Sequence, residues 1–126
     1  AYNYRLTNLA AALGCAQMEQ LPGFLVQKRK LSEAYKAFFK NLTIEFATEP
    51  QNGISNYWLN ALILKDKSEQ SSFLEFMNNN EVMVRPVWQL MNRLEMYKDC
   101  QCDSLTNTEW LADRVVNIPS SVIPTL

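Results

Sequence analysis

A group of polar and aromatic side chains at the start of the chain is the first set that could do chemistry. Tyr2, Asn3, Tyr4 and Arg5 stand immediately before a segment with helical character. The N–H groups at a helix entrance are unpaired, and amide and guanidinium side chains add further donors, so such a cluster can hold an anion. The sequence alone also allows a plainer interpretation, in which Asn3 caps the helix and Arg5 is a surface cation.

Histidine is absent from the 126 residues. A histidine triad, a histidine-ligated metal site and histidine acid–base catalysis are therefore excluded within this chain. The three cysteines are Cys15, Cys100 and Cys102. The last two are spaced too closely for the usual C-x-x-C metal or redox pattern, so we predict no metal site.

Two helices are predicted in the first third of the chain. The first covers about 7–21, Pro22-Gly23 interrupts the pattern, and the second covers about 23–40. Residues 9–16 are apolar on nearly every side of the first helix, and many of them are small. A small domain cannot enclose such a helix by itself, so we expect missing sequence or a partner subunit to cover it.

The remaining residues alternate between strand and helix signals. Strands are predicted at 42–46, 57–64 and 115–118, and a capped helix at Asp66. A further strand after residue 81 is confined to an edge or a terminus by Pro86, and Thr106 with Glu109 matches a second capping box. We predict one α/β (α+β) domain, a small three- to four-stranded sheet packed with helices and preceded by a long bent N-terminal helix pair. Residues 1–41 would be interface helices, and residues 42–126 the small α/β domain.

Composition argues against several classes of partner. Twelve basic and 13 acidic residues give a net charge of −1, which offers no basic excess for nucleic acid or an anionic membrane. Lys28, Arg29, Lys36 and Lys40 on the second predicted helix could form a phosphate-binding face, but the charge pattern favours a solvated surface. The chain has no apolar run of membrane-spanning length and no leader pattern, so we expect a cytoplasmic protein.

Three blocks of sequence resemble a known family. They are YNYRLTNL at residues 2–9, MVRPVWQLM at 83–91 and NIPSS at 117–121. Together they are similar to the C-terminal part of nucleotide-sugar aminotransferases of the DegT/DnrJ/StrS family. These enzymes depend on pyridoxal 5'-phosphate (PLP) and have the aspartate-aminotransferase fold type I. The second and third blocks look like those of the subgroup that aminates UDP-linked 4-keto sugars.

The resemblance implies transfer of an amino group, commonly from glutamate, to a keto sugar in the synthesis of surface-glycan precursors. In that family, the lysine that bonds to PLP lies in a large N-terminal domain. No lysine of this chain stands in a matching context, so we expect no catalytic residue here, no tight binding of PLP and no activity of the chain alone. The seven lysines are Lys28, Lys30, Lys36, Lys40, Lys65, Lys67 and Lys98.

The family's dimers give Asn3 a role. The resemblance implies that Asn3 crosses the subunit boundary and hydrogen-bonds the phosphate of PLP held by the neighbour, with Arg5 adding charge at the same site or pairing with a carboxylate. The expected partners are a second copy bound through the N-terminal helix, the missing N-terminal PLP domain and a UDP-sugar substrate.

The second block supplies candidate substrate-binding residues, namely Arg85, Trp88 and Asn92. Where the family has a pattern like L-M-H-x-L-P-x-Y, Asn92 replaces the histidine and Glu95 replaces the proline. Asparagine does not take up a proton near neutral pH, so any proton-linked role of that position is in question. Trp88 and Trp110 could instead be core aromatic residues, an interpretation that is stronger for Trp110.

Two other functions remain open at this level. The chain could be a non-enzymatic dimerisation module derived from the same fold, in which only the first helix matters. It could also be a small domain that binds a sugar nucleotide by itself, although half of the proposed pocket would then be missing.

Overall fold

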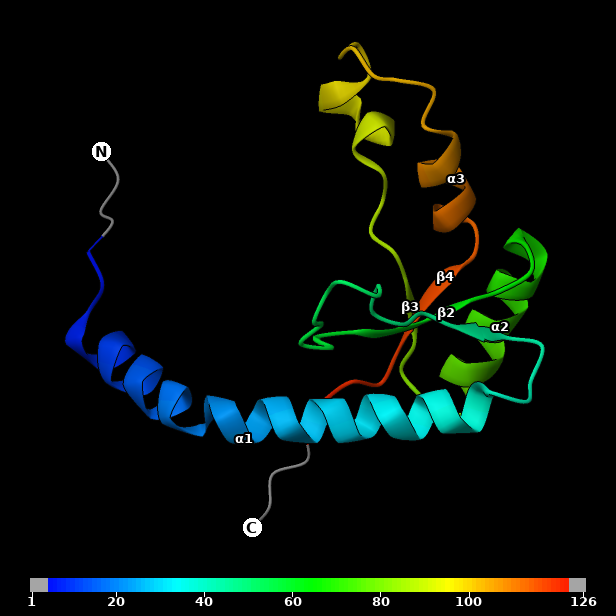
Figure 1. The fold of residues 1–126 in the computed structure, drawn as a ribbon. Coiled ribbons are helices and arrows are strands. Elements are labelled where there is room, and N and C mark those ends of the chain that lie inside the picture. Colours follow the sequence, from blue (N-terminus) through cyan, green and yellow to red (C-terminus); the bar gives the residue numbers. More distant parts are fainter. Residues whose placement is uncertain (1–4, 123–126) are drawn as a thin grey trace.

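One long helix underlies the rest of the molecule. The computed structural model describes residues 5–122, and α1 spans Asn8–Phe39. The Thr7 hydroxyl caps it by accepting a hydrogen bond from the Ala10 amide at 3.2 Å. The predicted pair of helices is wrong, because α1 continues through Pro22. Proline removes one backbone hydrogen bond and crowds the preceding turn, which bends a helix as well as ending one, and Figure 1 shows α1 changing direction along its length.

A four-stranded antiparallel sheet forms the centre. Its strands are β1 (Glu45–Phe46), β2 (Asn60–Ile63), β3 (Arg85–Pro86) and β4 (Val115–Ile118), arranged in the order β1-β2-β4-β3. The central pair β2 and β4 aligns Leu62 with Val116. β3 lies at the edge, as its proline predicts, since Pro86 has no N–H to donate to a second neighbour.

The core lies on one face of this sheet. Burial alternates along β2 and β4, so that Leu62 and Val116 are wholly buried while their sequence neighbours are partly exposed. Both α1 and α2 pack against this face. The side chains that they contribute to it are Tyr35, Phe39, Phe73, Leu74 and Met77.

The helix α2 (Lys67–Asn79) begins where the sequence places its cap. The Asp66 carboxylate accepts from the Glu69 amide at 2.9 Å, and the Glu69 carboxylate accepts from the Lys65 amide at 2.7 Å. The predicted capping arrangement is therefore confirmed, with the return bond made to Lys65.

Between β3 and α3, residues 87–105 form a segment that we call the arm. It contains two short 3-10 turns, Met91–Arg93 and Glu95–Tyr97, and leads to α3 (Thr106–Ala112). The predicted capping box at Thr106 does not form: Leu105 holds the cap position with φ 54°, and no side chain caps the helix. Glu109 instead pairs with Arg93 of the arm at 3.7 Å.

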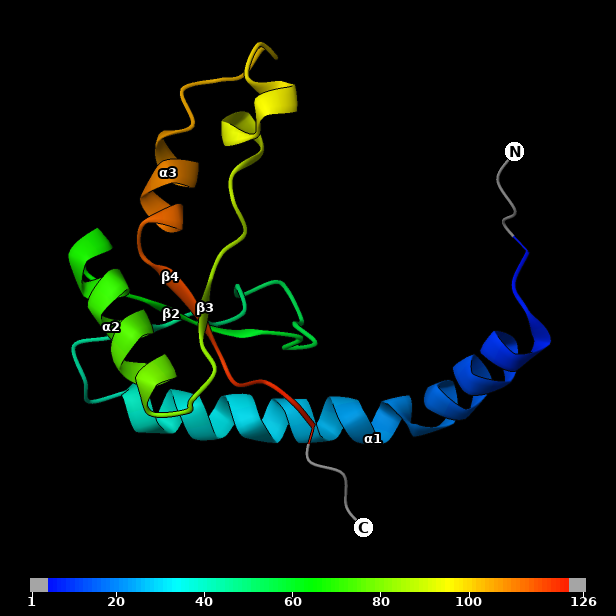
Figure 2. The same cartoon turned by 180° about the vertical axis from the view of Figure 1, so that it is seen from behind.

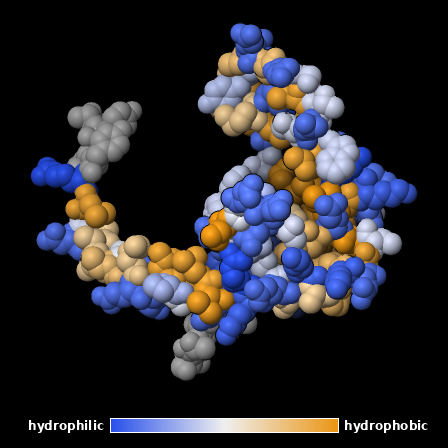
Figure 3. Space-filling model, viewed as in Figure 1, coloured by the Kyte–Doolittle hydropathy of each residue, from blue (hydrophilic) through white to orange (hydrophobic). Residues whose placement is uncertain are grey.

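The predicted fold class is confirmed: one small α/β domain with a four-stranded antiparallel sheet and packed helices. Two parts extend away from the sheet, the first half of α1 and the arm with α3. Both appear in Figure 1 and, from behind, in Figure 2. The side between these two extensions is concave in the space-filling view of Figure 3.

Candidate functional site

The first half of α1 presents apolar side chains to the outside. Leu9 is 75% exposed, Leu13 60% and Met18 65%. Figure 3 shows apolar side chains along this projecting part of the helix. No other described part of this chain therefore covers these apolar side chains. Arg5, at the entrance of the helix, is exposed, and Asn3 lies outside the described residues.

Arg29 and Glu49 fasten the middle of α1 to the loop between β1 and β2. The guanidinium donates to both Glu49 carboxylate oxygens at 3.0 and 3.2 Å and to the Ser55 carbonyl at 2.9 Å. The Ser55 amide donates to the same carboxylate at 2.7 Å. The bonds from Arg29, and secondarily from the Ser55 amide, lower the pKa of Glu49 below its ordinary value.

Lys28 makes a second attachment beside this ion pair. Its ammonium group donates to the carbonyl of Ser120 at 2.7 Å and to that of Trp58 at 3.1 Å. Ser120 is buried, and its hydroxyl accepts from the Asn60 amide at 2.7 Å. Lys28 and Arg29 thus hold the direction of α1, which is a more specific role than the solvated surface predicted for them.

The three candidate substrate residues do not converge on one pocket. Arg85 is exposed on the edge strand, where its guanidinium contacts the Met83 sulfur at 3.7 Å. Trp88 is 79% exposed and lies against Trp58, with 6.4 Å between the ring centroids. Asn92 is half-buried in the arm. Trp58 is a residue that sequence analysis missed, because only the sheet topology brings it to Trp88.

Trp88 and Trp110, which could have been core aromatic residues, both lie outside the core. Trp88 is mostly exposed, and Trp110 is 47% exposed. The Arg114 guanidinium, which lies between α3 and β4, stands over the Trp110 ring at 4.5 Å from its centroid, so this ring is a stacking partner for a cation. The core-aromatic interpretation is therefore wrong for both.

A pocket of about 460 Å³ opens where the arm meets α3. Among the candidate site residues that the structure describes, Asn92 alone lines it. The wall is largely apolar and also carries amide, hydroxyl and thiol groups. The lining residues are Gln89, Leu90, Met91, Asn92, Tyr97, Cys100, Gln101, Cys102, Leu105 and Thr108.

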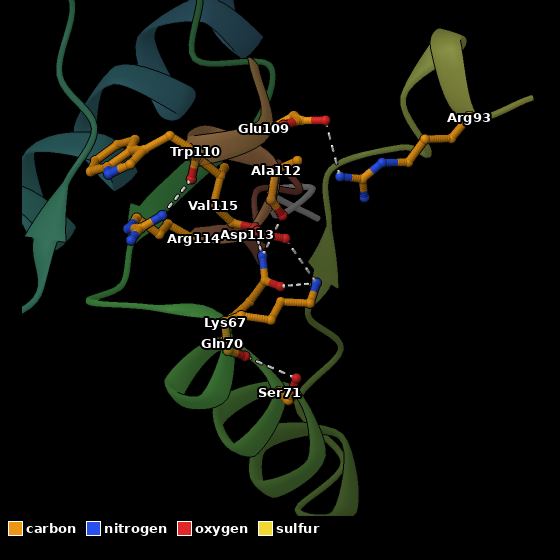
Figure 4. Close-up of polar contacts among 10 residues, drawn as sticks. All are labelled: Lys67, Gln70, Ser71, Arg93, Glu109, Trp110, Ala112, Asp113, Arg114 and Val115. Carbon is orange, nitrogen blue, oxygen red and sulfur yellow. Dashed lines mark hydrogen bonds and ion pairs between the residues drawn. The ribbon is translucent and has the colours of Figure 1, made fainter. Parts of the chain in front are cut away.

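A buried amide holds α3 in place to form one wall of this pocket. The Gln70 side chain, with no exposed surface, donates to the carbonyls of Ala112 at 3.0 Å and Val115 at 2.9 Å. Its oxygen accepts from Lys67 at 2.8 Å, and Lys67 also pairs with Asp113 at 3.7 Å. Figure 4 shows this set joining α2 to the end of α3 and the start of β4.

None of the described lysines is buried, whereas a site for covalent attachment of PLP would enclose its lysine. Such a site needs an ε-amine in an enclosed pocket and a carboxylate for the pyridine nitrogen. Lys28 and Lys67 are engaged as described, Lys98 pairs with Glu95, and the other four are exposed. Within residues 5–122 no group of three or more His, Cys, Asp or Glu side chains is placed to hold a metal ion. Nor does the described part of the chain contain a helix long and apolar enough to cross a membrane.

The chain belongs to the DegT/DnrJ/EryC1/StrS aminotransferase family, whose sequence model matches residues 1–124. It is 31% identical over 123 residues to GDP-perosamine synthase of Vibrio cholerae, covering 95% of this chain and 34% of that protein. It is 28% identical over 97 residues to EpsN of Bacillus subtilis, a putative PLP-dependent aminotransferase, covering 76% of this chain and 25% of that protein. The family is PLP-dependent, as the resemblance implies.

The fold matches the C-terminal domain of sugar aminotransferases. The sugar aminotransferase CalS13 of Micromonospora echinospora superposes with a TM-score of 0.85 at 17% identity. That superposition covers 99% of this chain and 33% of CalS13. The chain thus spans about one third of the length of the V. cholerae relative and of this solved structure.

Proposed function

We propose that this chain is the C-terminal small domain of a PLP-dependent aminotransferase. The enzyme would move an amino group from glutamate to a nucleotide-linked keto sugar in the synthesis of surface-polysaccharide or other glycan precursors. The match to the aminotransferase family over residues 1–124 carries this proposal. The uncovered apolar side chains of α1 support it, because they fit a domain that is completed by further sequence or by a second copy.

The contribution proposed for the first 41 residues is an interface. A second copy would pack on the exposed part of α1, and Asn3 would donate a hydrogen bond to the phosphate of PLP held by that copy. Arg5 would add positive charge nearby. PLP, when bound in the N-terminal domain, supplies the electron sink for amino-group transfer. The attachments at Lys28 and Arg29 support this role, since they fix the direction in which α1 presents its first turns.

Arg85, Trp88 and Asn92 are proposed to lie on the sugar-nucleotide side. The contact between Trp88 and Trp58 supports a stacking surface there, because two exposed indole rings from separate segments lie together. Asn92 would act through hydrogen bonds alone. Sequence resemblance favours a UDP-linked sugar, whereas the V. cholerae relative is named for a GDP-linked one. The experiment below therefore uses both.

A hybrid enzyme tests the proposal. Residues 1–126 would replace the matching third of the V. cholerae GDP-perosamine synthase, and amination of UDP- and GDP-linked 4-keto sugars would be measured with glutamate and with a second amino donor. We expect turnover with one nucleotide and with glutamate. The same hybrid with Phe76→Ala, a change at an exposed residue of α2, should be equally active. A folded hybrid that retains PLP but aminates neither sugar would contradict the proposal.

The chain alone should not form a covalent bond with PLP. After incubation with PLP and reduction with borohydride, we expect peptide mapping to find no single preferred lysine. A stable adduct on one unique lysine would show that the chain carries its own cofactor site.

A further inference from the structure

The arm carries two thiols that the proposed function does not use. Cys100 and Cys102 are both free and exposed, and both line the pocket that also contains Asn92. Because one residue separates them, their Cα atoms are at most about 7 Å apart even in a fully extended chain. Disulfides span Cα separations of about 4.4–6.8 Å, so the pair is within bridging range.

The backbone around the two thiols has few restraints. The Cys100 amide donates to the Tyr97 carbonyl at 3.0 Å. The next backbone–backbone hydrogen bond described along the chain joins the Glu109 amide to the Leu105 carbonyl. Residues 101–105 have no regular secondary structure. Bringing the two sulfur atoms together therefore requires rotation within a loop and leaves every helix and strand intact.

Metal binding does not account for this pair. Structural sites with cysteine ligands usually need four ligands. The sequence contains no histidine, and residues 5–122 place no third His, Cys, Asp or Glu side chain to complete such a group. The chemistry available to the two residues is that of a dithiol.

We propose that Cys100 and Cys102 form a thiol-modification site that reacts with small disulfides of the glutathione type. One cysteine thiolate attacks the small disulfide, which gives a mixed disulfide and releases one small thiol. The second cysteine thiolate attacks the protein sulfur of that mixed disulfide, which forms the Cys100–Cys102 bond and releases the second small thiol. The protein loses two electrons and two protons, and the small disulfide is reduced to two thiols.

Closure of this bond changes the pocket. Cys100, Cys102 and Asn92 all line it, so drawing the loop together moves two of its lining residues. A bond within so short a loop is strained and exposed, and such disulfides are readily reduced again. The modification is therefore reversible.

Treatment of the chain with oxidised glutathione tests the site. After reaction in mildly alkaline buffer, free thiols would be alkylated and the peptides mapped by mass spectrometry. We expect the Cys100–Cys102 bond without retained glutathione. Cys15 is an internal control, since it is also exposed but has no second cysteine near it in sequence, and it should end as a mixed disulfide or a free thiol.

Single substitutions separate the two steps of the reaction. Cys100→Ser and Cys102→Ser should each retain glutathione on the remaining cysteine of the pair, whereas Cys15→Ser should leave the intrachain bond unchanged. Stable glutathione adducts on both residues of the folded wild-type chain would overturn the proposal.

Discussion

The Gln70 side chain positions α3, which forms one wall of the pocket beside the arm. Its amide group satisfies two backbone carbonyls where α3 turns into β4, and its oxygen accepts from Lys67. An unpaired carbonyl in this buried place would lose its hydration without compensation. The side chain is therefore a structural requirement for the pocket between the arm and α3.

Replacing Gln70 with leucine should lower the free energy of unfolding by about 1–3 kcal/mol, because a buried carbonyl and a part-buried one lose their side-chain donor. Urea denaturation followed by circular dichroism measures this change. Ser71→Ala is the matched control, since this neighbouring hydroxyl is exposed and bonds only to its own helix, and it should change stability by less than about 0.5 kcal/mol. Equal effects of the two substitutions would contradict the assigned role.

The ion pair of Arg29 and Glu49 predicts a dependence of stability on pH. The folded pKa of Glu49 is lower than its ordinary value of 4.5. The pair therefore stabilises the fold fully above that ordinary value, and the contribution is lost as the pH falls through the lower folded pKa.

Glu49→Gln should remove this part of the pH dependence. The stability difference between wild type and variant, measured by urea denaturation from about pH 6 to about pH 3, should shrink as the pH falls. Glu75→Gln, at an exposed glutamate of α2, serves as the control and should leave the wild-type pH profile in place. A constant difference between wild type and Glu49→Gln at every pH would argue against the assignment.

At the scale of elements, sequence patterns located most of the fold. The strand at 115–118 and the cap at Asp66 were predicted correctly, because alternation and capping chemistry act over a few residues. The predicted separation into two helices at Pro22 was wrong, because a helix that Lys28 and Arg29 attach to the domain further along tolerates a proline within it. The predicted capping box at Thr106 was wrong, because Glu109 pairs with Arg93, a contact that sequence spacing does not reveal.

The exposed half of α1 should drive self-association of the chain. Leu13→Asp places a charge on this surface and should reduce association, measured by light scattering, without loss of helical circular dichroism. Phe76→Asp is the matched control, since Phe76 is 65% exposed on α2, and it should leave association unchanged. A wild-type chain that remains monomeric at high concentration would contradict the interface proposed for α1.

At the scale of the whole molecule, the described residues share one core, whereas the candidate site residues lie apart from one another. Arg85, Trp88 and Asn92 lie at separate places along β3 and the arm, and Asn3 is outside the described residues. The sequence could indicate these residues through the family resemblance. The spacing of these residues in the sequence does not reveal a shared site, and the described domain does not gather them into one pocket. In the proposed enzyme, the N-terminal domain and a second copy would provide the remaining walls of the active site.

Subunit complementation in the hybrid enzyme tests most directly whether this domain completes the cofactor site of a neighbour. One hybrid would carry Asn3→Ala, and a second would lack the lysine that bonds to PLP in the N-terminal portion. Each alone should be nearly inactive, and their co-expression should restore activity in mixed dimers, because one site then has both an intact lysine and an Asn3 from the other subunit. Mixed dimers without restored activity, or an Asn3→Ala hybrid as active as its parent, would contradict this account.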